Sequence, residues 1–527
     1  MFLVAMRNLA VPGKPFAAAL VTLLLASGAG AAVYVAADAP GPVHNGASWN
    51  TAFTTITAAV NSLAYGGDVW IKAGIYRECL AAKSYVNLYG GFLGFETSTS
   101  QRLIGAFPTI VDARQQGSAI SVPYNAWVTI DGLTLRRGRT LNGGGVFCDN
   151  SSVVKIRNCR IEDCRATICG GGVYWGKYTT GEMTDCFITG CTAPNGGGGV
   201  VEYHSYPVWR RVEIARNHAT ASGGGLHCPG HSGADLGNCT LVCNTAGSTG
   251  GAVQCQGSGS VTINNCVISG NCAPSGGGLY GANVDGQLTF SHCDFWQNDG
   301  GDWAGTIPTP PPTAGSFFAD PLFVKPDYDE YRLMPGSPCS GVGAYPLDTV
   351  VTVDRIGVAK MLDDGVQVRL SGKIVSCADG ATTYIQEPDR ASAIAVTGLF
   401  GFARSDIVSS VTGTLSTNPM GVRVLNASSS SIYQYGRCDP RPVAARPSWL
   451  PSALGLYART WGRVTGVATD GFSLTDGTNG TDRTDGTNGL YVRLPGNNVA
   501  IGDFVCVTGV YTANGDFRAS GVQLLSL

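Results

Sequence analysis

The sequence has few charged residues and no long run of either sign. Lysine, arginine, aspartate and glutamate make up 14% of the 527 residues, and the net charge is −2. A chain without a basic block has no electrostatic footprint for a phosphate backbone, so we expect no binding to nucleic acid. The 74 glycines lack the three-residue period of collagen. A hydrophobic content of 44% argues against intrinsic disorder.

Long apolar runs are absent except near the N-terminus. Arg7 and Lys14 precede the apolar stretch 16–26, and small residues follow at 29–31. This order is typical of a secretory signal peptide with an A-x-A cleavage site. The stretch is short for a bilayer span, and an uncleaved anchor is the alternative. We predict a signal peptide over residues 1–31, a secreted or cell-surface location, and no membrane span in the mature chain.

A glycine cluster followed by an aliphatic residue recurs through the middle of the chain. Its third small residue falls at positions 145, 172, 199, 225, 252 and 278, at steps of 26 or 27 residues. A second set of positions keeps this period and is mostly cysteine: Gly132, Cys159, Cys186, Val212, Cys239, Cys266 and Cys293. Two residues later comes an apolar side chain at every step but the first, where Thr134 stands. Five residues after the second set comes a third: Cys164, Cys191, Asn217, Asn244, Asn271 and Asn298.

Each period contains about three short segments with the alternation of a β-strand, and none with helical periodicity. A fixed period of this length indicates stacked units that bury their apolar faces against one another. We therefore predict an all-β solenoid of parallel coils, in which equivalent residues lie in columns about 4.8 Å apart. Small cysteines suit a narrow interior, and asparagines can hydrogen-bond from one coil to the next.

The ends of such a rod need covers, because open sheet edges invite further pairing. Residues 51–63 (TAFTTITAAVNSL) have the pattern of an amphipathic helix that could cover the first coil. The stretch 308–312 (PTPPP) interrupts the repeat, and residues 320–343 are expected to close the other end.

Several segments resemble the pectin-lyase-like, right-handed parallel β-helix superfamily. They are Tyr34–Ala39 (YVAADA) and Gly67–Ile71 (GDVWI) at the start, and Asp320–Phe323 (DPLF) and Pro335–Pro338 (PGSP) at the end. Within the repeat, 250–253 (GGAV) and 295–298 (FWQN) are similar to the paired motifs of polymorphic outer-membrane adhesin passengers. The resemblance covers about residues 33–346 and implies the fold. The superfamily includes lyases, hydrolases, epimerases and adhesins, so the resemblance leaves the activity open.

The glycine period stops near residue 354, and alternating segments follow. Their order is repeated, which predicts two five-stranded barrels of the OB type over 354–430 and 453–527, joined by a linker over 438–451. OB barrels bind oligonucleotides or oligosaccharides, and we expect sugar binding or a structural role. The motif TDGTNG at 475–480 recurs at 484–489. It could hold Ca²⁺, although a duplicated turn is the favoured interpretation.

The third coil departs from its neighbours and carries our candidate catalytic residues. In the aligned repeat, Glu202 stands where the neighbouring coils carry Cys148, Trp175, Cys228 and Cys255, and His204 follows it. Glu202 or His204 could act as a general base, and Arg211 could neutralise the carboxylate of an acidic sugar. Asp185 is equivalent to Arg211 one coil below. A surface ion pair between them is the simpler alternative.

Further side chains are candidates for ligand binding. Trp209 and Arg210 precede Arg211, and four residues share a ladder position directed away from the interior: Phe147, Tyr174, His227 and Tyr280. Such a column could stack on sugar rings or pack under a loop. Most of the 18 cysteines are expected to fill the core, although stacked pairs such as Cys164 with Cys191 could form bridges. The segment 228–231 (CPGH) is half of a zinc site at best, so we predict no metal centre there.

The leading hypothesis is a bacterial surface or secreted protein that binds polysaccharides or cell-surface glycans without catalysis. A polysaccharide lyase or glycoside hydrolase acting near Glu202 is the first alternative. A structural spacer in the cell envelope is the second.

Overall fold

The computed structural model describes residues 32–525, except 284–287, 308–314, 346–349, 380, 400, 420, 441, 445–453, 476–489, 497, 502 and 513–515. The predicted signal peptide, the proline stretch 308–312 and the duplicated motif beyond Thr475 lie outside the described residues.

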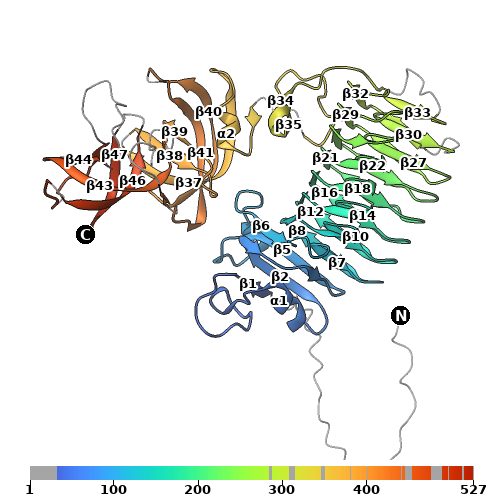
Figure 1. Ribbon diagram of the computed structural model, residues 1–527, viewed down its shortest axis with the longest axis horizontal. Coiled ribbons are helices and arrows are strands. Elements are labelled where there is room, and N and C mark those ends of the chain that lie inside the picture. Colours follow the sequence, from blue (N-terminus) through green and yellow to red (C-terminus); the bar gives the residue numbers. More distant parts are fainter. Residues whose placement is uncertain are drawn as a thin grey trace, which may run out of the picture.

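Residues 33–305 form a parallel β-helix in which each strand pairs with its equivalent one coil away (Figure 1). Sheet A contains β1 (Val33–Val35), β2 (Gly67–Lys72), β5 (Val86–Phe92), β8 (Trp127–Asp131), β12 (Val153–Arg157), β16 (Thr180–Thr184), β20 (Val208–Arg210), β24 (Ala234–Gly237), β28 (Val261–Asn264) and β31 (Leu288–Ser291). Sheet B contains β3 (Gly74–Tyr76), β6 (Thr109–Asp112), β9 (Leu133–Arg136), β13 (Arg160–Glu162), β17 (Phe187–Thr189), β21 (Glu213–Ala215), β25 (Thr240–Val242), β29 (Val267–Ser269) and β32 (Asp294–Trp296).

The other two sheets complete the coils. Sheet C contains β4 (Leu80–Ala81), β7 (Ile120–Val122), β11 (Val146–Cys148), β15 (Val173–Trp175), β19 (Gly199–Val201), β23 (Leu226–Cys228), β27 (Val253–Gln256), β30 (Leu279–Ala282) and β33 (Trp303–Gly305). Sheet D contains β10 (Arg139–Asn142), β14 (Arg165–Cys169), β18 (Thr192–Asn195), β22 (His218–Ser222) and β26 (Thr245–Ala246). The middle coils therefore have four strands, one more than the sequence predicts.

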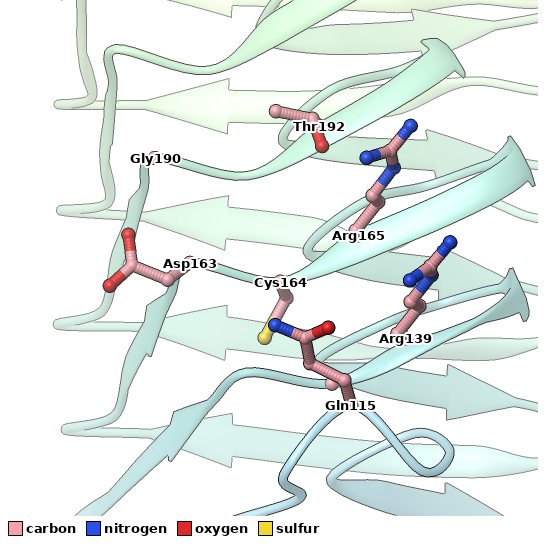
Figure 2. Close-up of a pocket in the computed structure, with 8 residues that line it drawn as sticks. Gln115, Arg139, Asp163, Cys164, Arg165, Gly190 and Thr192 are labelled. Atoms are coloured by element: carbon pink, nitrogen blue, oxygen red, sulfur yellow. The ribbon is translucent and has the colours of Figure 1, made fainter.

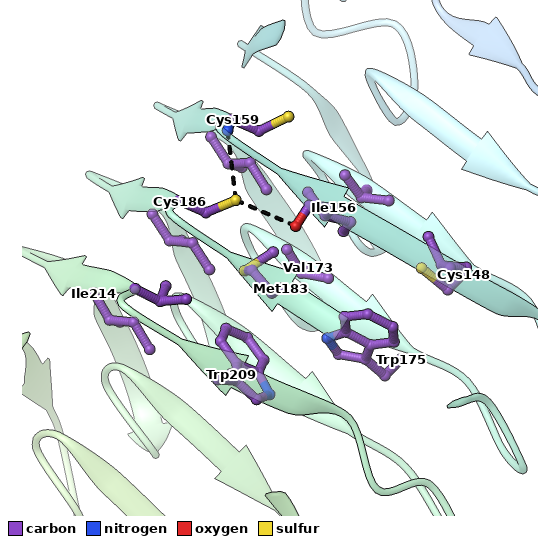
Figure 3. Packing of buried hydrophobic residues seen from close by; sticks show 14 of the residues in the cluster. Cys148, Ile156, Cys159, Val173, Trp175, Met183, Cys186, Trp209 and Ile214 are labelled. Atoms are coloured by element: carbon purple, nitrogen blue, oxygen red, sulfur yellow. Dashed lines mark hydrogen bonds between the residues drawn. The ribbon is translucent and has the colours of Figure 1, made fainter. Parts of the chain in front are cut away.

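The cysteines form an interior column, as predicted. The Cys159 amide donates to Cys186 Sγ at 3.4 Å, and the Cys186 thiol donates to Ile156 O at 3.5 Å (Figure 3). Further along, the Cys239 amide donates to Cys266 Sγ at 3.3 Å. All 18 cysteines are free thiols. Eleven of them are buried and fill the core, as predicted for most of them, and no neighbouring pair forms a bridge.

Two parts of the predicted register are wrong by one residue. Thr134 pairs with Arg160, so Leu133 takes the place in the cysteine column that we assigned to Gly132. Gly199 pairs with Val173 and with Leu226, so the residue that matches Trp175 is Val201 and not Glu202. The four consecutive glycines before Val200 allow either alignment in the sequence. The 26-residue step lies between Gly172 and Gly198, whereas we placed it between Gly199 and Gly225.

The asparagines bridge the coils as predicted. Asn217 Nδ2 donates to Asn244 Oδ1, Asn244 Nδ2 to Asn271 Oδ1, and Asn271 Nδ2 to Asn298 Oδ1, each at 3.0 Å. Each Oδ1 also accepts the backbone amide of the preceding asparagine. Because Asn217, Asn244 and Asn271 are fully buried, these bonds satisfy groups that water cannot reach.

The start of the rod is covered by α1 (Ile56–Ser62), which the sequence predicts. The Thr55 hydroxyl caps the helix by accepting the Ala58 amide, and Glu78 accepts the amides of Ile56 and Thr57. Ile56, Ala59 and Val60 are buried against the first coil. None of the helices in the described part of the chain is long and apolar enough to cross a membrane.

The segment 320–343 does not cover the other end, contrary to expectation. Its hairpin of β34 (Phe323–Lys325) and β35 (Glu330–Leu333) lies on the outer face of sheet B, where Tyr331 packs on Ala215 and Val242. The last coils instead close on a cluster of rings, namely Phe290, Phe295, Trp303 and Phe318. The chain thus turns back along the rod after the last coil.

Two closed sheets follow. The first contains β36 (Val351–Thr352), β37 (Gln367–Asp379), β38 (Thr382–Gln386), β39 (Ala393–Thr397), β40 (Asp406–Thr417) and β41 (Arg423–Arg437), with α2 (Ile356–Ala359) after β36. The second contains β42 (Val443–Ala444), β43 (Tyr457–Ala468), β44 (Gly471–Thr475), β45 (Leu490–Arg493), β46 (Phe504–Tyr511) and β47 (Phe517–Leu524). The first sheet closes because β37 also pairs with β40, and the second closes because β43 also pairs with β46. Five strands therefore form each barrel, and the short first strand is added at its side.

The barrels differ in extent from the predicted segments. The first sheet continues to Arg437, beyond the expected end at residue 430, and β42 of the second lies inside the expected linker. The first barrel also contacts the first coils of the rod (Figure 1). There Phe107 packs with Ile374, Ile407 and Tyr433, and the Tyr433 hydroxyl donates to Gln101 O.

Candidate functional site

The candidate catalytic residues of the third coil separate onto two corners. Arg211 lies between β20 and β21, where sheet A turns into sheet B. Its Nε and Nη2 atoms donate to the two carboxylate oxygens of Asp185 at 2.6 and 2.8 Å. Both side chains are nearly half exposed, at 49% and 42%. This is the surface ion pair of the simpler alternative, and exposed pairs of this kind contribute little stability.

Trp209 and Arg210 do not face a ligand together with Arg211. Trp209 is fully buried and packs edge-on against Trp175 inside the rod, with ring centroids 6.3 Å apart (Figure 3). Its assignment to ligand binding is therefore wrong, because alternate residues of β20 point inward. Arg210 points outward from sheet A and pairs with Asp235 of the next coil.

Glu202 and His204 lie at a different corner, between sheets C and A. Glu202 follows β19 directly, and its backbone amide donates to Trp175 O at 2.9 Å. Its carboxylate is close enough to Tyr174 and Cys169 to raise the pKa of both groups, in addition to the larger effect of burial. Glu202 is thus next to the outward face of sheet C.

Six side chains form a continuous column on that outward face, here called the outer column: Phe147, Tyr174, Val200, His227, Gln254 and Tyr280. The four residues predicted to share this ladder position do share it, and Val200 and Gln254 fill the remaining coils. Phe147 and Tyr174 stack face to face, with centroids 5.4 Å apart and an interplanar angle of 8°.

The middle of the outer column holds buried polar groups. His227 is 8% exposed and Gln254 is 5% exposed. Both ring nitrogens of His227 and the Oε1 atom of Gln254 lack a hydrogen-bond partner. Burial lowers the pKa of His227 to about 4, with the nearby Gln254 opposing this only in part. His227 is therefore neutral at physiological pH and retains one donor and one acceptor.

The corner between sheets C and A carries exposed aromatic rings, here called the corner cluster: Tyr178, Tyr203, His204 and His231. Tyr178 stacks on His204 at a centroid distance of 5.4 Å, and His204 stacks on His231 at 5.8 Å. Tyr203 meets the two histidines edge-on, at 4.0 and 5.1 Å. Serines occupy the equivalent positions in the adjacent coils, Ser151 on one side of the stack and Ser258 on the other. The Ser258 hydroxyl and His231 Nδ1 form a hydrogen bond of 2.5 Å.

The backbone of the corner cluster is left-handed. Tyr178 and His204 have φ values of +60° and +58°, and the equivalent Ser151 has +60°. Because Asp185 and Arg211 adopt the same conformation at another corner, it belongs to the geometry of the coils. At this corner it leaves Tyr178 56% exposed.

The structure thus brings Glu202, His204 and Tyr174 to one side of the rod and leaves Asp185, Arg211 and Trp209 elsewhere. Sequence reasoning missed Tyr178, His231 and Gln254. The 26- or 27-residue step aligns Tyr178 and His231 with His204, so the repeat itself contained the signal. Among the described residues no group of three or more His, Cys, Asp or Glu side chains could hold a metal ion.

A separate cavity of about 220 Å³ lies beside sheet D. Arg139 and Arg165 occupy equivalent positions on β10 and β14, and their side chains run parallel while Asp163 points away from them (Figure 2). Gln115 and Thr192 also line it. Neither arginine was among the predicted site residues.

The comparison with protein families agrees with the fold. Residues 118–305 match a family described as the right handed beta helix region. No curated protein matches the chain. Pectin methylesterase from Aspergillus niger, in its deglycosylated form, is 13% identical, with 55% of this chain and 84% of that chain covered and a TM-score of 0.29. A penultimately deglycosylated form of that enzyme gives 13% identity, 56% and 91% coverage and the same TM-score. At this identity and TM-score these two structures carry no argument about activity. Residues 118–305 are thus a right-handed parallel β-helix region.

Proposed function

We propose that the protein binds a glycan chain along the outer column and the corner cluster, without cleaving it. The exposed stack of Tyr178, His204 and His231 carries this proposal. Aromatic faces and edges are suited to the apolar faces of sugar rings, and tyrosine and histidine also offer polar atoms to sugar hydroxyls. An extended polymer could follow the rod axis, because equivalent residues repeat about every 4.8 Å.

The ends of the outer column support the same proposal. Phe147, Tyr174 and Tyr280 are half-buried, so one side of each ring remains available to a sugar. The unpartnered atoms of His227 and Gln254 are shielded from solvent and do not contribute. Glu202, which follows β19 beside this column, would accept hydrogen bonds from sugar hydroxyls.

A lyase or hydrolase is less well supported. The cation expected to neutralise an acidic sugar, Arg211, is engaged by Asp185 at another corner. Inverting and retaining hydrolases need two carboxyl groups across the scissile bond. Asp185, the only partner expected for Glu202, does not lie at the corner of Glu202.

The same proposal includes export to the cell exterior, where such a glycan would be met, as the N-terminal sequence predicts. We also propose that the two barrels are OB-like accessory modules, since each has five strands in a closed Greek-key order.

The test is a panel of acidic and neutral polysaccharides, measured with the full mature chain for both binding and release of new chain ends. Tyr178→Ala and His204→Ala should each lower affinity about tenfold, equal to about 1.4 kcal/mol. Tyr328→Ala is the matched control, because Tyr328 is 55% exposed, as Tyr178 is, and belongs to the hairpin on the outer face of sheet B. Cleavage that Glu202→Gln abolishes would overturn the non-catalytic proposal. Equal loss in the control would overturn the site.

A further inference from the structure

The two barrels dock against each other, and the seam between them forms an open cavity of about 700 Å³. This volume is within the usual range for small-ligand sites, which occur preferentially between domains. The barrels pack through an apolar cluster, in which Tyr384, Ala395 and Val424 of the first barrel contact Val510 of the second, and Val510 also lines the cavity. The Ser376 hydroxyl and the Gly455 carbonyl, 2.6 Å apart, fix the barrels to each other.

Polar side chains from both barrels meet in this cavity. Arg404, which precedes β40, donates to the Tyr457 hydroxyl at 3.1 Å, and its guanidinium lies over the Tyr457 ring at 5.3 Å. The Tyr457 hydroxyl is 3.0 Å from Ser520 Oγ on β47. A chain of three polar groups therefore crosses the seam from the first barrel to the second.

The charge of Arg404 is not neutralised by a carboxylate among the described residues. The other arginine contributed by the first barrel, Arg437, is paired with Asp406 at 2.8 Å. Arg404 uses one donor for Tyr457 and keeps the rest of its planar fork for a ligand. A guanidinium in this state favours a carboxylate or sulfate, which it can bind with two parallel hydrogen bonds.

We propose that the seam between the barrels binds a sugar residue that carries a carboxylate or a sulfate. Arg404 binds the anionic group, and the hydroxyls of Tyr457 and Ser520 bind sugar hydroxyls. Phe402 and Ala519, which also line the cavity, offer apolar surface to the sugar ring. The site is distinct from the outer column and the corner cluster, and it exists only because the barrels dock.

The experiment is calorimetric titration of the full mature chain with three short ligands: a uronic-acid disaccharide, a monosulfated disaccharide and the neutral disaccharide of the same linkage. Inorganic sulfate is a fourth arm. At least one anionic disaccharide should bind, at least tenfold more tightly than the neutral one and than sulfate alone. Binding of the neutral sugar as tight as that of the acids, or of sulfate as tight as that of the sugars, would overturn the proposal.

Variants connect the binding to the seam. Arg404→Met should lower the affinity of the preferred disaccharide at least tenfold. Arg459→Met is the matched control, because Arg459 of the second barrel is exposed, as Arg404 is, but does not line the cavity. This control substitution should change the affinity less than twofold. Tyr178→Ala should leave this binding unchanged, which separates it from the proposed function of the rod. Equal effects of Arg404→Met and Arg459→Met would refute the site.

Discussion

The hydrogen-bonded column of Asn217, Asn244, Asn271 and Asn298, here called the asparagine ladder, is predicted to stabilise the rod. The substitution Asn244→Ala tests this. The Asn244 side chain accepts hydrogen bonds from the Asn217 amide and Asn217 Nδ2, and donates to Ile214 O and Asn271 Oδ1. Three of these partners keep a second bond. Asn217 Nδ2 still donates to Ile188 O, Asn271 Oδ1 still accepts the residue 244 amide, and Ile214 O lies in the ladder between β21 and β25 opposite the Val242 amide. The Asn217 amide loses a bond that water cannot replace.

The expected loss of stability follows from this one group. A buried donor left unsatisfied costs about 1–3 kcal/mol, so Asn244→Ala should lower the free energy of unfolding by about 1–3 kcal/mol. The control is Asn264→Ala, because Asn264 lies on the outward face of sheet A and accepts a single bond from the Ser291 hydroxyl. That change should cost at most about 1 kcal/mol.

Urea unfolding followed by tryptophan fluorescence measures the difference, since Trp175 and Trp209, two of the nine tryptophans, are fully buried in the rod. Amide exchange should accelerate most in the coils next to residue 244 and least in the barrels, because repeat units contact only their neighbours. Equal destabilisation by Asn244→Ala and Asn264→Ala would show that the ladder does not support the rod.

Three further predictions concern buried groups. Burial raises the pKa of Glu213 to about 7 from 4.5. The Glu213 carboxyl therefore holds its proton more tightly in the folded protein than in the unfolded chain. The free energy of unfolding should fall as pH rises from about 4.5 to about 7. Glu213→Gln should remove this slope in thermal scans across that pH range, and an unchanged slope would contradict it. Lys373→Met should destabilise the first barrel by about 3–5 kcal/mol in denaturant unfolding, because it leaves the buried Glu387 carboxylate unpaired; a cost below about 1 kcal/mol would argue against a buried pair. A thiol reagent should modify the exposed Cys79 in the native protein, whereas column residues such as Cys266 should react only on unfolding; early labelling of Cys266 would be incompatible with the column.

The repeat was predictable because it has a physical cause. Stacking equivalent residues puts the same requirement on every coil, and the cysteine and asparagine columns therefore keep their period in the sequence. The errors arose where the period changes by one residue. Gly196–Gly199 contains four glycines, and nothing in their composition tells which of them pairs with Val173.

The candidate site was predictable only in part for the same reason. The outer column follows the repeat, so its members could be found by counting. The separation of Glu202 from Arg211 depends on which corner of the coil each occupies, and the misplaced register hid it. The docking of the two barrels and the packing of the hairpin on sheet B involve surfaces without any period, so the sequence carried no signal for them.

The contact of the first barrel with the first coils has a consequence for how this protein can evolve. The chain leaves the top of the rod at the last coil, descends along sheet B and reaches the loop around Gln101 and Phe107. Gly372 approaches this loop so closely that a Cβ atom there would lie 2.0 Å from Ala106 Cβ. The first barrel therefore meets this loop only if the rod has the right length. Gain or loss of one coil would move the barrel by about 4.8 Å and break this fit, so the number of repeats is fixed here, whereas in an open solenoid it is free to drift.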